Sequence, residues 1–174
     1  MEHSSDGMAV LRTVLRSVEI DPRWRERITT ALSNGVGVHL AVFVEPFLEA
    51  ILDGRKTMES RFGVHRCAPF DRVGAGDLIL LKRSGGPVVG IAVAGRASFY
   101  KLDAAKLGDI RDRYAAQIFA EDDDFWNARA EKRFATLIEI EHVTPIETTS
   151  VQKKDRRGWV TYREGRQPCL VAGI

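Results

Sequence analysis

The sequence has few cysteines and no long apolar run. Its 174 residues include two cysteines, Cys67 and Cys169, and neither stands in a CxxC pair or in another spacing typical of metal ligands. Two reduced thiols are usual in a cytoplasmic protein. No apolar run approaches the roughly 20 residues of a membrane helix, and Met1 to Gly7 has no signal-peptide core. We therefore expect a cytoplasmic protein with no membrane segment, no metal site and no cofactor.

The chain also lacks a strong excess of charge of one sign. It has 26 basic and 24 acidic residues, a formal net charge of +2, which argues against a histone-like binder. At 44% hydrophobic residues it can build a core, which argues against global disorder. The charge is nevertheless segregated: residues 51–101 hold nine basic and four acidic residues, whereas 103–131 hold eight acidic and four basic. We expect one basic face and an acidic helical cap.

Apolar periodicity and turn residues predict the order of the elements. Two helices are expected within the first 36 residues, the first with a stripe at Val10, Val14 and Val18 and the second beginning at Asp21-Pro22. Further helices are expected at Pro46–Asp53 and within Asp103–Ala130. The expected strands are Val38–Val44, Lys56–Phe62, Asp77–Arg83, Pro87–Ala94, Arg133–Val143 and Gly158–Arg163.

This order predicts an α+β fold. About five or six strands, mostly joined by hairpins, favour a small, mostly antiparallel, strongly bent sheet or β-barrel with peripheral helices. A parallel dinucleotide-binding sheet is disfavoured, because no helix separates the three middle strands and no GxGxxG is present. We expect an N-terminal helical extension packed on the domain (1–36), a barrel domain (37–164) and a C-terminal tail (165–174).

The densest polar cluster is the segment GRKTMESR at 54–61, between an expected helix end and a strand. It supplies cations, a carboxylate and hydroxyls, a mixture that suits a phosphate or a polar base edge beside an apolar pocket. The alternative is an exposed strand with cross-strand ion pairs. The residues that we single out in it are Arg55, Lys56, Thr57, Glu59, Ser60 and Arg61.

In its setting, this segment resembles the ASCH domain of the PUA-like superfamily. The resemblance runs through Glu45–Leu52, Gly54–Phe62 and Gly76–Lys82, and continues through Val88–Val93 and Phe134–Val143. It implies a PUA-like β-barrel with a cleft beside the Lys56 to Arg61 strand. It also implies that the partner is RNA or another single-stranded nucleic acid, or a small nucleoside-like ligand.

Some members of this family hydrolyse N4-acetylcytidine with a lysine, a threonine and a glutamate, and others are reported as ribonucleases. The lysine falls on Lys56 and the threonine on Glu59, so these two are the catalytic candidates; for the glutamate, Glu121 and Ile118 are alternative equivalents. A lysine acting as base or nucleophile needs a lowered pKa, which an adjacent carboxylate opposes. Glu59 therefore counts against the acetylcytidine hydrolase, and whether the chain is an enzyme stays open.

A second basic cluster, KKDRRGW at 153–159, ends on a tryptophan. Arg156 and Arg157 suit phosphate, and Trp159 suits stacking on a base; the alternative is a solvated turn followed by a core tryptophan. The leading hypothesis is an RNA or modified-nucleotide binding domain that uses both clusters. The second is a hydrolase acting on RNA or nucleosides. The third is a protein-interaction module with an exposed stripe at Val10, Val14 and Val18. The oligomeric state is left open.

Overall fold

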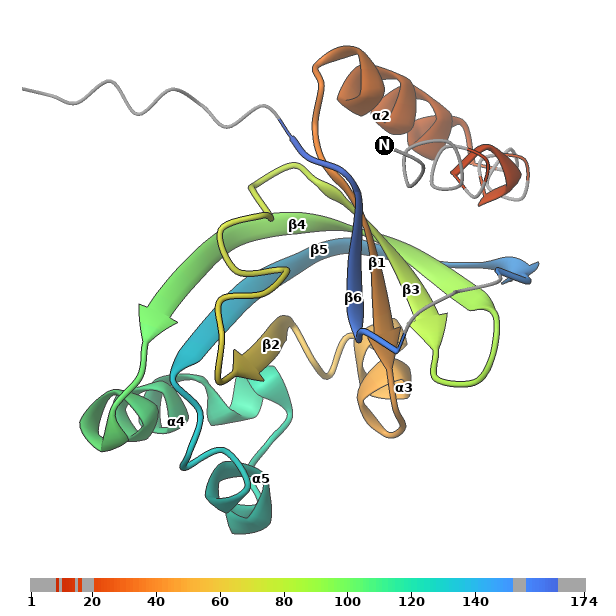
Figure 1. The fold of residues 1–174 in the computed structure, drawn as a ribbon. Helices are drawn as coiled ribbons and strands as arrows, with labels where there is room; N and C mark the ends of the chain where they lie inside the picture. Colours follow the sequence, from red (N-terminus) through yellow and green to blue (C-terminus); the bar gives the residue numbers. More distant parts are fainter. Residues whose placement is uncertain (1–8, 10, 15, 17–20, 152–155, 166–174) are drawn as a thin grey trace, which may run out of the picture.

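Six strands form one strongly curved sheet in the computed structural model of the chain, with helices at its ends (Figure 1). The structure describes residues 9, 11–14, 16, 21–151 and 156–165. The helices with defined bounds are α2 (Pro22–Ser33), α3 (Phe47–Leu52), α4 (Ala104–Ile118) and α5 (Asp123–Asn127). The strands are β1 (Val38–Phe43), β2 (Met58–Gly63), β3 (Leu78–Arg83), β4 (Val88–Lys101), β5 (Phe134–Thr149) and β6 (Trp159–Arg163).

The sheet has the order β2-β5-β4-β3-β1-β6. Four of its strand pairs are antiparallel, and one, β1 with β3, is parallel. The expected α+β fold with a bent, mostly antiparallel sheet is confirmed. The sheet curls into a half-barrel, and β2 and β6 are its two edge strands.

The two central strands are longer than their patterns predict. β4 and β5 pair from Val88↔Thr149 to Lys101↔Phe134, whereas the apolar alternation suggested ends near residues 94 and 143. The register of β4 against β5 shifts between Ala94 and Ala97. Gly95 lies in this bulge, where a Cβ would lie 2.6 Å from an oxygen of Glu141. A glycine at such a close approach lets a strand bend and continue.

The N-terminal helical residues belong to the core of the domain. Leu11 and Val14 are helical and fully buried, and they pack with Leu40 of β1 in one apolar cluster. The exposed stripe that the protein-interaction hypothesis requires is therefore not found at Val14, because this side chain is buried in the domain. Val10 and Val18 lie outside the described residues.

The helices α4 and α5 cover the region next to the edge strand β2. Their side chains Ile110 and Trp126 pack with Met58 of β2 and Leu137 of β5. This packing places the chain that leaves α5 beside the GRKTMESR segment. Among the described helices, none is long and apolar enough to cross a membrane.

Candidate functional site

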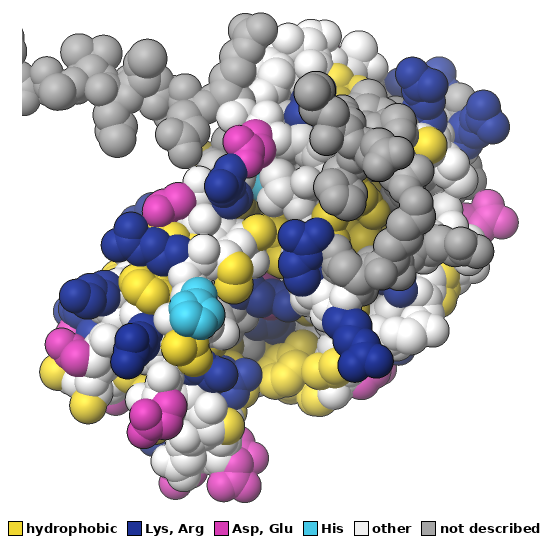
Figure 2. Space-filling view, in the orientation of Figure 1, with side chains coloured by type: hydrophobic (Ala, Val, Ile, Leu, Met, Phe, Trp, Pro, Cys, Tyr) yellow, Lys and Arg dark blue, Asp and Glu magenta, His cyan; other side chains and the backbone are white. Residues whose placement is uncertain are grey.

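A cavity of about 400 Å³, the main cavity, opens beside β2. It lies among β2, the end of β1, α3 and the segment that follows α5. One carboxylate and four cations line it: Glu59, Lys56, Arg61, Arg129 and Lys132. Figure 2 shows lysine and arginine side chains gathered on this face, around and within a hollow. The main cavity is therefore a positively charged recess.

Lys56 lies in the wall of this cavity with its ammonium fully hydrogen-bonded. Nζ donates to the carbonyl oxygens of Met58, at 2.7 Å, and Ile118, at 2.9 Å, and lies 3.2 Å from Glu59 Oε2. Three acceptors match the three protons of an ammonium. Burial lowers the pKa of Lys56 from 10.5, and the Glu59 carboxylate opposes this shift.

Glu59 pairs with two cations at once. Beside its contact with Lys56, its Oε1 lies 2.6 Å from Arg61 Nε. The geometry is that of an ion pair rather than a directed hydrogen bond, since Arg61 Nε has no hydrogen-bond partner. The Glu59 side chain is 6% exposed, so its charge needs these partners.

Arg61 bridges the open side of the half-barrel. From the edge strand β2, its Nη1 donates to the carbonyl oxygen of Gly158 at 3.2 Å, and its Nη2 donates to that of Val42 at 3.0 Å. The guanidinium also lies over the rings of Phe43, at 5.2 Å, and Trp159, at 5.6 Å. Arg61 therefore ties β2 to β1 and to the start of β6.

Arg129 is a cavity residue that the sequence analysis missed. Its guanidinium carbon lies 3.3 Å from the centroid of the Phe125 ring and 5.3 Å from that of Phe62. Burial lowers its pKa, and Glu59 opposes the shift. The segment looked acidic as a whole, and Arg129 lies in the turn that follows α5; its spacing of four residues from Phe125 was a usable signal, since such pairs can meet.

Aromatic rings form the apolar part of the wall. Phe43, Phe47, Phe62 and Phe125 all line the main cavity. Phe125 lies 6.0 Å from Phe47 and 6.2 Å from Phe62 between ring centroids. Aromatic faces next to cationic side chains favour a planar ligand that carries negative charge.

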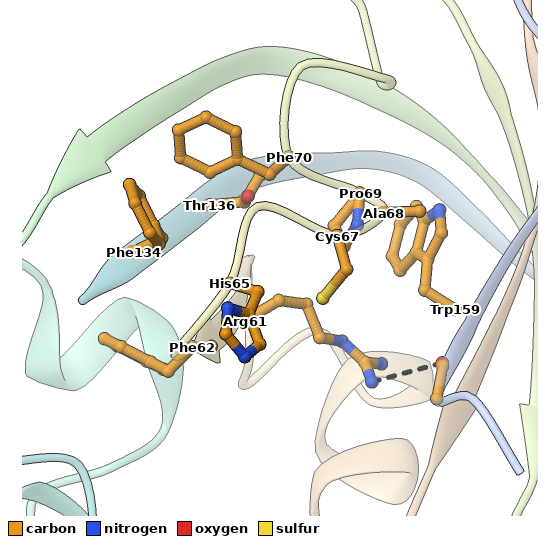
Figure 3. A pocket seen from close by; sticks show the side chains of 12 residues that line it. Arg61, Phe62, His65, Cys67, Ala68, Pro69, Phe70, Phe134, Thr136 and Trp159 are labelled. Carbon is orange, nitrogen blue, oxygen red and sulfur yellow. Dashed lines mark hydrogen bonds between the residues drawn. The ribbon is translucent and has the colours of Figure 1, made fainter. Parts of the chain in front are cut away.

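A smaller cavity of about 190 Å³, the side cavity, lies beyond Arg61 (Figure 3). It lies between the sheet and the chain that leaves β2, is open to solvent, and is lined in part by Cys67, Phe70, Phe134 and Trp159. Arg61 and Phe62 line both cavities.

The structure divides the predicted ligand-binding residues. Lys56, Glu59, Ser60 and Arg61 line the main cavity, and Trp159 lines the side cavity. Arg55 and Thr57 are exposed and line neither; Arg55 pairs with Asp53 at 3.0 Å. These two remain predicted ligand-binding residues without support from the cavity geometry.

The second basic cluster lies partly outside the described residues, because 152–155 are not among them. Arg156 and Arg157 are exposed and line neither cavity. Trp159 is only 2% exposed. Its indole is therefore a core side chain with one edge in the side cavity, and the expected open stacking surface is not formed by it.

A buried polar network lies behind Trp159. Its Nε1 donates to His39 Nδ1 at 3.2 Å, and His39 Nε2 lies 3.0 Å from Asp77 Oδ2. An indole nitrogen is only a donor, so Nδ1 must accept and Nε2 must carry the proton that is donated to Asp77. Asp77, the aspartate of the Gly76-Asp77 pair, therefore has a structural role.

The positions considered for the catalytic glutamate have different surroundings. Ile118 lies beside Lys56 but contributes a backbone carbonyl, and Glu121 is exposed and does not line the main cavity. Among the residues that the structure describes, no group of three or more histidine, cysteine or acidic side chains is placed to hold a metal ion.

Comparison with protein-family models and with curated proteins finds no match. Solved structures of the ASCH protein of Zymomonas mobilis do match. One has a TM-score of 0.50 at 18% identity, with 64% of this chain and 72% of that chain covered. A serine-to-alanine mutant of the same protein has a TM-score of 0.59 at 16% identity, with 75% and 91% covered. The resemblance found in the sequence is thus confirmed at the level of the fold, and the chain has the fold of an ASCH domain.

Proposed function

We propose that the main cavity binds a nucleotide of single-stranded RNA, or a modified nucleotide. The observation that carries this proposal is the combination of four cations, one carboxylate and four phenylalanine rings around a space of about 400 Å³. That volume falls in the range of roughly 300–1,000 Å³ that ligand cavities occupy. The rings suit a base, and the excess of positive charge suits its phosphate.

The polar groups divide into two roles in this proposal. Arg129 and Lys132, from the segment after α5, contact phosphate. Glu59, deeper in the wall, accepts a hydrogen bond from an exocyclic amine, because each carboxylate oxygen has a lone pair beyond its ion pair. Bases with an amine, such as cytosine and adenine, are then preferred over uracil.

An unsatisfied donor adds support. Among the described residues, two buried side-chain nitrogens have no hydrogen-bond partner, Arg61 Nε and Arg129 Nε. Arg61 Nε already faces Glu59 in an ion pair, whereas Arg129 Nε belongs to a side chain that lines the main cavity. Buried donors without partners are uncommon in folded proteins, so Arg129 supports the proposal of an anionic ligand.

Loss of a cavity cation is expected to weaken RNA binding without changing the fold. Arg129→Gln and Lys132→Gln should each reduce affinity for a short, mixed-sequence, single-stranded RNA by about tenfold and reduce the salt dependence by about one charge. Fluorescence anisotropy at several salt concentrations measures both quantities. Arg113→Gln, an equal charge change at an exposed position of α4, is the matched control. Equal affinity in all three variants and the wild type would refute the proposal.

Affinity is also expected to fall as the pH rises from neutrality toward 10.5. Burial lowers the pKa of Lys56 from 10.5, so its ammonium loses its proton earlier than an exposed lysine would, and the cavity then loses one positive charge. Oligocytidylate is the probe, since its bases do not ionise in this range. Lys132→Gln should retain the fall and Lys56→Met should lack it; a flat wild-type profile would contradict this role of Lys56.

A second candidate function is hydrolysis of an acylated nucleoside. The observation in its favour is a lysine of lowered pKa at a cavity wall, a feature common at active sites. Against it, all three protons of the Lys56 ammonium face acceptors within the protein. Conversion of N4-acetylcytidine by the wild-type protein but not by Lys56→Met would favour the hydrolase.

A further inference from the structure

The side cavity is small and polar at one end. Its volume of about 190 Å³ is below the roughly 300 Å³ at which cavities for whole ligands begin. In Figure 3, the Cys67 sulfur lies near the Arg61 side chain, whose guanidinium points toward Gly158, and the rings of Phe70 and Phe134 stand at the other end. A space of this size suits one part of a larger ligand.

The position of the side cavity indicates where the rest of that ligand lies. Arg61 and Phe62 separate it from the main cavity and line both. A ligand that extends from one cavity to the other must therefore pass over Arg61. The side cavity is a continuation of the main cavity rather than an independent site.

The chemistry at this crossing suits a phosphate. Of the five N–H groups of a guanidinium, Arg61 uses two in hydrogen bonds to backbone carbonyls. Each terminal nitrogen keeps a second N–H, and the side chain is 23% exposed. A phosphodiester over Arg61 would meet a fixed positive charge with donors to spare.

The far end of the side cavity suits a base. Phe70 and Phe134 lie 5.4 Å apart between ring centroids. The guanidinium of Arg66 lies 5.6 Å from the first ring and 5.3 Å from the second. Aromatic rings with an adjacent arginine are the usual surface for an unpaired base and its phosphate.

We propose that the two cavities take two consecutive nucleotides of one single strand, with the linking phosphate at Arg61. The proposal rests on the proposed function and narrows its ligand from a nucleotide to a dinucleotide step. The protein then binds strands in preference to free nucleotides, because a mononucleotide leaves the side cavity empty.

A length series tests this directly. We expect the dinucleotide of cytidylate to bind at least about tenfold more tightly than the mononucleotide, with a smaller gain from a third nucleotide. Cys67 is an exposed free thiol that lines the side cavity, so its reactivity reports whether the cavity is occupied. In a Cys169→Ser background, alkylation of Cys67 by iodoacetamide should slow when the dinucleotide is bound and should not slow with saturating mononucleotide.

Two conservative variants separate the cavities. Phe134→Leu removes a ring of the side cavity and should abolish the dinucleotide advantage while leaving mononucleotide affinity unchanged. Phe47→Leu, the matched change in the main cavity, should weaken both ligands. Single-stranded RNA that binds with no dinucleotide advantage and no protection of Cys67 would overturn this inference and leave the proposed function standing. Failure of every nucleotide and RNA to bind would overturn both.

Discussion

The Glu59→Leu variant is expected to lose about 3–5 kcal/mol of its free energy of unfolding, the usual result of removing one partner of a buried ion pair. The Lys56 side chain is 2% exposed. Its ammonium would keep its two carbonyl partners but lose the carboxylate that pairs with it. Arg61 would lose the same partner. Urea unfolding at neutral pH, followed by circular dichroism, measures the loss.

A second variant separates the lost charge pair from the lost packing. Lys56→Met/Glu59→Leu removes both charges, and we expect it to lose less than the sum of the two single losses, because no unpaired ammonium remains. Two buried carbonyl acceptors still lose their donor, so recovery is partial. Glu121→Leu, at an exposed acid, should change stability by less than about 0.5 kcal/mol. Additive losses in the double variant would show that the buried pair is not coupled.

The expected coupling changes how the GRKTMESR segment is understood. Its alternation was compatible with an exposed strand carrying cross-strand ion pairs. Ion pairs are present, but they are buried, because the end of α4 closes over the strand: Thr57 N donates to Gln117 O at 3.0 Å, and Ile118 supplies a carbonyl to Lys56. A lysine and a glutamate three residues apart thus shape the cavity wall before they contact any ligand.

Local patterns predicted most elements of the fold. Asp21 caps α2 as expected, since its side chain accepts from Arg23 N, and β3 pairs with β4 as a hairpin. Local patterns could not predict which strands pair when those strands are distant in the sequence. The parallel contact of β1 with β3 and the pairing of Met58 with Glu139 join segments whose partners no periodicity specifies, because a strand's alternation shows its buried face but not its neighbour.

The candidate site was predictable where its residues are close in sequence. Lys56, Glu59 and Arg61 lie within six residues, so one dense polar segment revealed them. Arg129, from the segment 103–131 that was counted as acidic, and Lys132, which follows that segment, reach the same cavity, and only the fold brings them there. The net charge of a segment averages over all of its residues, whereas only a few of its side chains line a cavity.

Asp77→Ala is expected to have an effect as large as that of Glu59→Leu. The Asp77 carboxylate accepts hydrogen bonds from Gly37 N and Gly74 N and from His39 Nε2, and Asp77 is 4% exposed. Each donor left without a partner costs about 1–3 kcal/mol, so we expect a loss of about 3–5 kcal/mol in urea unfolding. Asp53→Ala, at an exposed ion pair, is the matched control and should lose less than about 1 kcal/mol.

The same variant connects stability to the side cavity. Without Asp77, the Nε2 proton of His39 loses its acceptor, so the ring is held less firmly where its Nδ1 accepts from the Trp159 indole, which forms part of the side-cavity wall. We therefore expect folded Asp77→Ala protein to show a shifted indole N–H resonance for Trp159 and a reduced dinucleotide advantage, with mononucleotide affinity retained because the main cavity lies beyond Arg61. An unchanged resonance together with wild-type stability would contradict this network, since a carboxylate that anchors three donors cannot be removed without either effect.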